Sequence, residues 1–100
     1  MENTNIFALI TGASSGIGKC YAEQLAERGY NILIISNQEQ QNKEVAEHIS
    51  NKFGVKAIAL YKDLSDKNSA HEIYDFCQAN NIEVEILINN AGILLFDPLD

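Results

Sequence analysis

Four short apolar runs, separated by segments with helix periodicity, restrict the folds open to this chain more than any other feature. The runs are rich in Ile, Leu and Val, and they cover residues 6–10, 32–35, 55–60 and 84–88. Runs of this kind are typical of strands that are buried on both faces of a parallel sheet. We therefore expect the chain to fold around such a sheet.

The segments between the runs carry apolar residues at helix spacing. The first segment begins at Ile17 and is followed by a stop signal at Gly29, and the second is closed by Gly54. The third opens after Ser65, whose hydroxyl can cap a helix start. The order β-α-β-α-β-α-β with short connections predicts an α/β fold with helical crossovers. Right-handed crossovers place the first two helices on one face of the sheet and the third helix on the other.

Composition limits the classes of partner. Hydrophobic residues make up 46% of the 100 residues and charged residues 21%, which is ordinary for one small globular domain. The formal net charge of −7 argues against nucleic acid or an anionic membrane surface as a partner, because both require a basic face. The start, MENTN, does not have the pattern of a signal peptide, and the apolar runs are too short for a membrane span.

The cysteines and histidines do not indicate a metal site. Cys20 and Cys77 lie far apart, without a second pair of ligands, at apolar positions of expected helices. Reduced, buried thiols are the simplest interpretation, and they fit a cytoplasmic compartment. His48 and His71 lie on polar helix faces, and we expect them to be solvated, like the acid-rich segment 39–47.

A glycine-rich segment, TGASSGIG, stands between the first strand and the first helix. A helix N-terminus presents unpaired backbone N–H groups and a partial positive charge, so it attracts phosphate. Gly12, Gly16 and Gly18 keep the turn tight and let the backbone approach a pyrophosphate. Ser14 and Ser15 add hydroxyl donors. Alone, however, such a segment also suits a tight strand-to-helix turn that binds nothing.

The glycine spacing in this segment is T-G-x-x-x-G-x-G rather than the common G-x-G-x-x-G, because Tyr21 stands where the third glycine would be. Two further motifs follow later strands. Asp63-Leu64 follows the third apolar run, and Asn89-Asn90-Ala91-Gly92 follows the fourth. Ligands of open α/β sheets bind at these strand ends. In all three motifs the chain resembles the short-chain dehydrogenase/reductase family, from its first strand to its last residue.

The resemblance implies a Rossmann-type, doubly wound parallel sheet with the strand order 3-2-1-4 in this stretch, the first half of the full fold. It implies that the pyrophosphate and adenosine ribose of NAD(P) would be surrounded by Gly12, Ser14, Ser15, Gly16, Ile17 and Gly18. Asp63 would accept a hydrogen bond from the adenine amino group, and Leu64 would offer its backbone N–H. The ribose would lie along Asn90, Ala91 and Gly92, with Asn89 or Asn90 also tying neighbouring strands together. For both asparagines the structural and the cofactor-binding role stay open.

The end of the second run bears on the choice of cofactor. Family members that prefer NAD have an acidic residue there for the ribose 2′-hydroxyl, whereas those that prefer NADP have an Arg nearby. Here the run ends in Ser36-Asn37, and the nearest acid, Glu39, belongs to the next turn. Because no carboxylate would repel a 2′-phosphate there, Ser36, Asn37 and Lys19 could together accept NADP. The sequence therefore favours NADP over NAD.

The family's reaction centre, a Ser followed by a Tyr with a Lys four residues further on, is not found in the chain. No residue is therefore assigned a catalytic role. We interpret residues 1–100 as the N-terminal part of a single NAD(P)-binding Rossmann domain, with the catalytic part absent. In the full-length protein, the resemblance implies hydride transfer between NAD(P)(H) and a small carbonyl/alcohol substrate.

Two alternatives stay open. The first is a dinucleotide-binding sensor without catalysis, which a Tyr-x-x-x-Lys motif beyond residue 100 would exclude. The second is a truncated half-domain without a ligand, which dinucleotide binding by the chain would exclude. Self-association of the isolated chain is also expected, because the fourth strand would form an exposed sheet edge.

Overall fold

The computed structural model describes residues 6–12, 16–63 and 66–89. In these ranges, strands and helices alternate in the order predicted from the sequence. The strands are β1 (Ile6–Thr11), β2 (Asn31–Ser36), β3 (Ala57–Tyr61) and β4 (Glu83–Asn89). The helices are α1 (Gly16–Glu27), α2 (Glu39–Phe53) and α3 (Ser69–Ala79).

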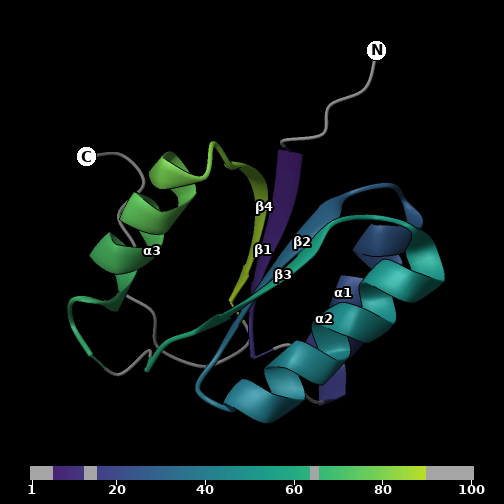
Figure 1. Cartoon of the computed structure of the whole chain (residues 1–100), viewed down its shortest axis with the longest axis horizontal. Coiled ribbons are helices and arrows are strands. Elements are labelled where there is room, and N and C mark those ends of the chain that lie inside the picture. The colour runs from purple at the N-terminus through teal and green to yellow at the C-terminus, as the bar shows by residue number, and fades with distance from the viewer. Residues whose placement is uncertain (1–5, 13–15, 64–65, 90–100) are drawn as a thin grey trace.

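All strands pair in parallel, in the order β3-β2-β1-β4, which confirms the order that the family resemblance implies. Thr11 at the end of β1 pairs with Ile35 of β2 and with Asn89 of β4. Ser36 at the end of β2 pairs with Tyr61 of β3. The carboxyl ends of the four strands therefore lie at one edge of the sheet, in the lower part of Figure 1.

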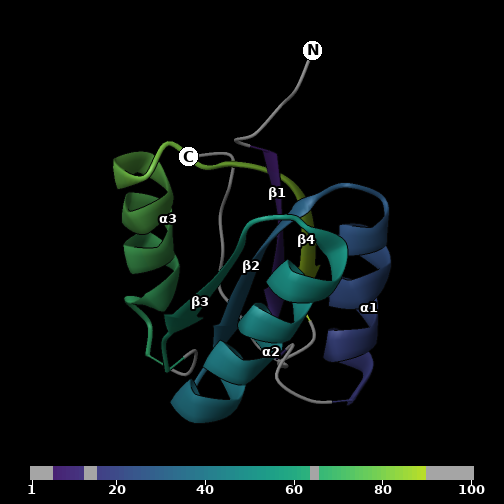
Figure 2. The same cartoon turned by 45° about the vertical axis from the view of Figure 1, so that its right-hand side comes forward.

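The helices form a layer on each face of the sheet. In Figures 1 and 2, α1 and α2 lie together on one face and α3 lies on the other, as right-handed crossovers require. The core under α1 and α2 consists of Ala8, Ile10, Ala22, Ala26, Ile32, Ile34, Val45, Ala46 and Ile49. The core under α3 consists of Phe7, Leu9, Leu33, Ile35, Ile73 and Cys77. Successive residues of β1 and β2 alternate between these cores, so both strands are buried on both faces, as predicted.

Strand β3 is more exposed than its apolar run predicted, whereas β4 forms the exposed sheet edge that was expected. Every residue of β3 is partly or fully exposed, and β4 alternates between exposed and half-buried residues. The register between β1 and β4 shifts at Glu85, which has no partner in β1. This bulge turns Val84 toward the α3 core, whereas Ile86 and Ile88 pack against the other core. Leu87 keeps 40% of its surface exposed.

The bulged residue makes a contact of its own. The Tyr30 hydroxyl, just before β2, donates a hydrogen bond to Glu85 Oε1 at 2.9 Å. This hydrogen bond and the negative charge of Glu85 raise the pKa of the Tyr30 phenol above its usual value. The contact joins the loop before β2 to the exposed edge strand.

Two local predictions need correction. Helix α3 begins at Ser69 after Asn68 rather than after Ser65, which lies outside the described residues. Cys77 is buried as predicted, and burial raises the pKa of its thiol, but Cys20 is exposed. Helical periodicity places Cys20 beside apolar neighbours, yet the face of α1 that carries it is not covered by any other described element.

Other helix features agree with the sequence. The exposed histidines His48 and His71 lie near Glu23 and Asp75, each with a nitrogen–oxygen separation of 3.4 Å. Helix α2 ends at Gly54, which has a left-handed φ of 72°.

Across the three described ranges, no helix is both long and apolar enough to cross a membrane. Those ranges also bring together no group of three or more acidic, His or Cys side chains suited to a metal ion.

Asn42 is a buried polar residue that the sequence pattern did not identify. It lies in the first turns of α2 and is 1% exposed. Its Nδ2 donates hydrogen bonds to the carbonyl oxygens of Ile34 and Leu60, each at 3.2 Å. Its Oδ1 is buried without a hydrogen-bond partner among the described residues. The side chain thus fastens the start of α2 to both β2 and β3.

We predict that Asn42→Ala lowers the free energy of unfolding by about 2 kcal/mol, because two buried hydrogen bonds and the packing of the side chain are lost. The matched control is Gln40→Ala on the exposed face of the same helix, where the side-chain amide donates a hydrogen bond to Glu44 Oε2 at 3.1 Å; it should cost less than about 0.5 kcal/mol. Urea denaturation measures both values. Equal losses for the two variants would contradict the role of Asn42.

Candidate functional site

The candidate site lies at the carboxyl edge of the sheet, where backbone and side-chain contacts join the strand ends. Gly12 N donates to Ile35 O at 2.9 Å, and Lys62 N donates to Ser36 O at 3.1 Å. Thr11 Oγ1 donates to Asn89 Oδ1 at 2.9 Å and so joins β1 to β4. The structure therefore confirms that Asn89 ties neighbouring strands together, one of the two roles considered for it. It also brings the predicted residues after β1, β2 and β3 to the same edge.

The described part of the glycine segment has the backbone that its sequence predicts. Gly12 and Gly16 adopt positive φ angles of 71° and 58°, which L-residues with side chains rarely adopt. Gly18 is buried within α1, and Ile17 is exposed to 67%. The first turn of α1 contains no acidic side chain, so its partial positive charge is not offset there. This end of the helix can attract a phosphate group.

Six of the predicted site residues lie outside the described residues, and their roles stay predictions. They are Ser14, Ser15, Leu64, Asn90, Ala91 and Gly92.

A hydrogen bond to the Ser36 side chain shapes the turn at the end of β2. Ser36 is 5% exposed, and its Oγ accepts a hydrogen bond from Gln38 N at 3.0 Å. Asn37, between them, is exposed. Glu39 begins α2, and its carboxylate lies 3.9 Å from Lys43 Nζ, one turn along the helix. The exposed groups that follow β2 directly are thus amides rather than carboxylates.

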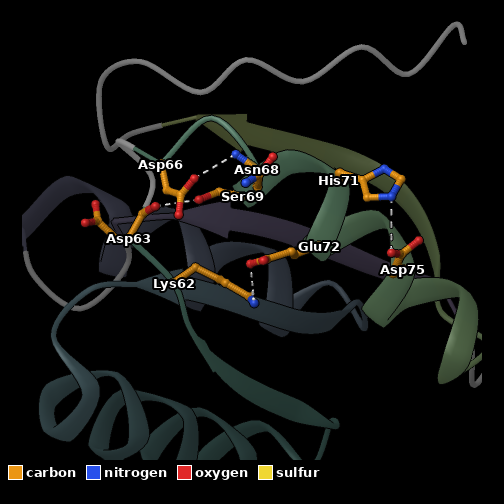
Figure 3. A network of polar contacts seen from close by, with 8 residues as sticks. All are labelled: Lys62, Asp63, Asp66, Asn68, Ser69, His71, Glu72 and Asp75. Carbon is orange, nitrogen blue, oxygen red and sulfur yellow. Dashed lines mark hydrogen bonds and ion pairs between the residues drawn. The ribbon is translucent and has the colours of Figure 1, made fainter.

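Asp63 follows β3 and is exposed, while its main chain is held by the turn into α3 (Figure 3). The Asp63 carbonyl oxygen accepts hydrogen bonds from Asp66 N, at 3.0 Å, and from the Ser69 hydroxyl. Asp66 Oδ1 in turn accepts from Asn68 N at 2.9 Å. In Figure 3 the Asp63 carboxylate points away from Ser69, whereas the Asp63 carbonyl oxygen faces the Ser69 hydroxyl.

Ser69, which is 2% exposed, is a buried residue of this turn that was not predicted from the sequence. A signal was available, because residues 66–69 read Asp-Lys-Asn-Ser, and short polar side chains of this kind bond the backbone where helices begin. The same signal was assigned to Ser65 instead.

A shallow hollow elsewhere has a different character. It has a volume of about 390 Å³ and lies between α2 and β3, lined by Lys43, Ala46, Glu47, Ser50, Asn51, Ala57 and Ala59. It includes neither a helix N-terminus nor any of the predicted site residues. The carboxyl edge, which combines a helix N-terminus, glycine backbone, hydroxyl groups and a carboxylate, is the better site for a nucleotide.

Comparison with known proteins agrees with the motifs. The family described as short chain dehydrogenase matches residues 7–99. The chain is 39% identical over 88 residues to the very-long-chain 3-oxoacyl-CoA reductase of Candida glabrata, covering 86% of this chain and 24% of that protein. It is also 39% identical over 88 residues to the inactive hydroxysteroid dehydrogenase-like protein 1 of Rattus norvegicus, covering 86% and 26%. The chain thus spans about a quarter of the length of these relatives.

A solved structure gives the same result for the fold. L-sorbose reductase from Gluconobacter frateurii, complexed with NADPH and L-sorbose, superimposes with a TM-score of 0.81 and 31% sequence identity. The superposition covers 89% of this chain and 34% of the reductase. The four-stranded sheet with its three helices therefore corresponds to one part of a larger Rossmann-like fold.

Proposed function

Because the chain belongs to the short-chain dehydrogenase family, we propose that it binds the adenosine and pyrophosphate half of an NAD(P) cofactor. In the whole protein, this cofactor would exchange a hydride with a carbonyl/alcohol substrate. The observation that carries the proposal is the convergence of Gly12, Ser36 and Asp63 at the edge of the sheet where α1 begins. The nicotinamide supplies the hydride chemistry, and the protein positions it.

Each group at the edge has a defined task in this proposal. The pyrophosphate lies against the N-terminus of α1, where backbone N–H groups and the helix dipole favour negative charge. Gly12 and Gly16 let the main chain approach the phosphates closely, because a side chain would stand between them. Asp63 accepts a hydrogen bond from the adenine amino group. Asn90 to Gly92, which lie outside the described residues, would follow the ribose.

We predict that Gly12→Val weakens NADPH binding more than about 100-fold, because the side chain strains the backbone and occupies the place of the pyrophosphate. The matched control is Gly29→Val at the far end of α1, where φ is 97° and no atom would contact an added Cβ. The control should lose stability through the same strain but keep its affinity. Calorimetric titration of both variants with NADPH tests this. Unchanged affinity in Gly12→Val, or an equal loss in the control, would refute the phosphate site.

We propose NADP rather than NAD as the preferred cofactor. Two observations support this choice. The residues directly after β2 present no carboxylate to a 2′-phosphate, because Asn37 is an exposed amide and the Glu39 carboxylate lies beside Lys43. In addition, the similar L-sorbose reductase was solved with NADPH.

The predicted reversal of cofactor preference uses Ser36→Asp, whose carboxylate can still accept the hydrogen bond from Gln38 N. Its charge should repel a 2′-phosphate and lower the affinity for NADP relative to NAD about tenfold. Ser36→Asn introduces a side chain of nearly the same shape as that of Asp but without its charge. It should leave the ratio of the NADP and NAD affinities almost unchanged. Competitive binding of the two cofactors measures the ratio. A native protein that strongly prefers NAD would show the proposal to be wrong.

A second candidate function is dinucleotide binding without turnover. It is favoured by the similarity to a rat protein whose name describes it as inactive. NADPH oxidation by the whole protein with a 3-oxoacyl thioester distinguishes the two, and this substrate is chosen because the Candida glabrata relative is named a 3-oxoacyl-CoA reductase. Binding without oxidation of NADPH by any carbonyl substrate would favour the sensor.

We also propose that the chain on its own self-associates through β4. This strand lies at the sheet edge next to β1, and Leu87 is 40% exposed on it. Unpaired strand edges with apolar side chains favour association. Sedimentation velocity should show dimers or larger species at high concentration. Leu87→Lys should reduce them, whereas Tyr61→Lys on the opposite edge strand should not. A native chain that stays monomeric at every concentration would contradict this proposal.

A further inference from the structure

The turn between β3 and α3 contains a buried hydroxyl that the proposed cofactor contacts do not use. Ser69 is the first residue of α3 and is 2% exposed. Its Oγ donates a hydrogen bond to the Asp63 carbonyl oxygen, as Figure 3 shows. A buried hydroxyl is unfavourable unless it is hydrogen-bonded. The contact therefore favours one arrangement of the Asp63 main chain.

Ser69 is itself placed by contacts that do not involve Asp63. Ser69 N donates to Asp66 O at 3.0 Å, and Glu72 N donates to Asn68 O at 3.0 Å. Asp66 Oδ1 accepts a hydrogen bond from Asn68 N at 2.9 Å. These hydrogen bonds hold the backbone at the start of α3 and thereby fix the position of the Ser69 hydroxyl.

The residue before Asp63 is fixed as well. Lys62 N donates to Ser36 O at 3.1 Å, which extends the pairing of β3 with β2 by one residue. The Lys62 ammonium lies 2.7 Å from Glu72 Oε1 on α3. Asp63 is therefore held between a strand and a helix. Because χ1 of the side chain takes only a few staggered values, a fixed backbone limits the Asp63 carboxylate to a few positions.

We propose that Ser69 is a positioning residue for adenine recognition, which acts by holding the Asp63 carboxylate where it meets the adenine amino group. The inference rests on the proposed function. Removal of the hydroxyl leaves the Asp63 carbonyl with Asp66 N, so the carboxylate samples more positions and must be ordered when the ligand binds. The loss of affinity is confined to ligands that present an amino group to Asp63.

The test compares NADPH with its hypoxanthine counterpart, in which an oxygen replaces the adenine amino group, on the whole protein. Ser69→Ala should weaken binding of NADPH about fivefold, the effect of one hydrogen bond, and change binding of the hypoxanthine dinucleotide less than about twofold. Asp63→Asn should likewise reduce the discrimination between the two. Ser69→Thr, which keeps the hydroxyl, should restore NADPH affinity. His71→Ala, at an exposed position of α3, is the matched control and should change neither affinity.

Each outcome decides the inference. An equal loss of affinity for both dinucleotides in Ser69→Ala would show general structural damage and overturn it, as would unchanged NADPH affinity. If Ser69→Ala does not fold, Ser69→Cys, nearly the same in shape but a weaker donor, should show the same selective loss at smaller size, and a non-selective loss would overturn the inference. A native protein that binds neither dinucleotide would instead refute the proposed function, a result distinct from those above.

Discussion

Parallel pairing of the central strand β1 with both of its neighbours is the constraint on which the rest of the structure depends. In a parallel sheet the carboxyl ends of all strands lie at the same edge, so residues far apart in the sequence meet there. Thr11 pairs with Ile35 on one side and with Asn89 on the other. The hydrogen bond between Thr11 and Asn89 secures this meeting point at its centre.

Polar groups are distributed unevenly as a result. The buried polar residues of the described chain are Thr11, Asn31, Ser36, Asn42 and Ser69. Of these, only Asn31 stands at the amino end of a strand, where its Oδ1 accepts a hydrogen bond from Lys56 N. The others end strands or begin helices at the carboxyl edge. Apolar residues fill both cores, and the buried hydroxyl and amide groups shape the loops that would receive the cofactor, as expected where a functional site departs from the rules of core packing.

The strands and helices could be predicted from periodicity, and their order in the sheet from the family resemblance that three motifs carry. It did not predict features that depend on neighbours in space. The exposure of β3 follows from its place at the sheet edge, and the bulge at Glu85 shifts which core the side chains of β4 reach. Asn42 lies in a polar, acid-rich helix segment and therefore resembled a solvated residue, although it faces the ends of two strands. Ser69 was missed because Ser65 offered an equally good cap by sequence alone.

Titration of the isotopically labelled protein with NADPH, followed through its backbone amide signals, tests directly whether the carboxyl edge of the sheet binds the cofactor. The signals of Gly12, Asn37 and Asp63, at the carboxyl edge, should shift on binding. Signals at the opposite edge, such as those of Asn31 and Glu83, should stay in place. Shifts confined to the hollow between α2 and β3, or to the amino ends of the strands, would show that the carboxyl edge does not bind the cofactor.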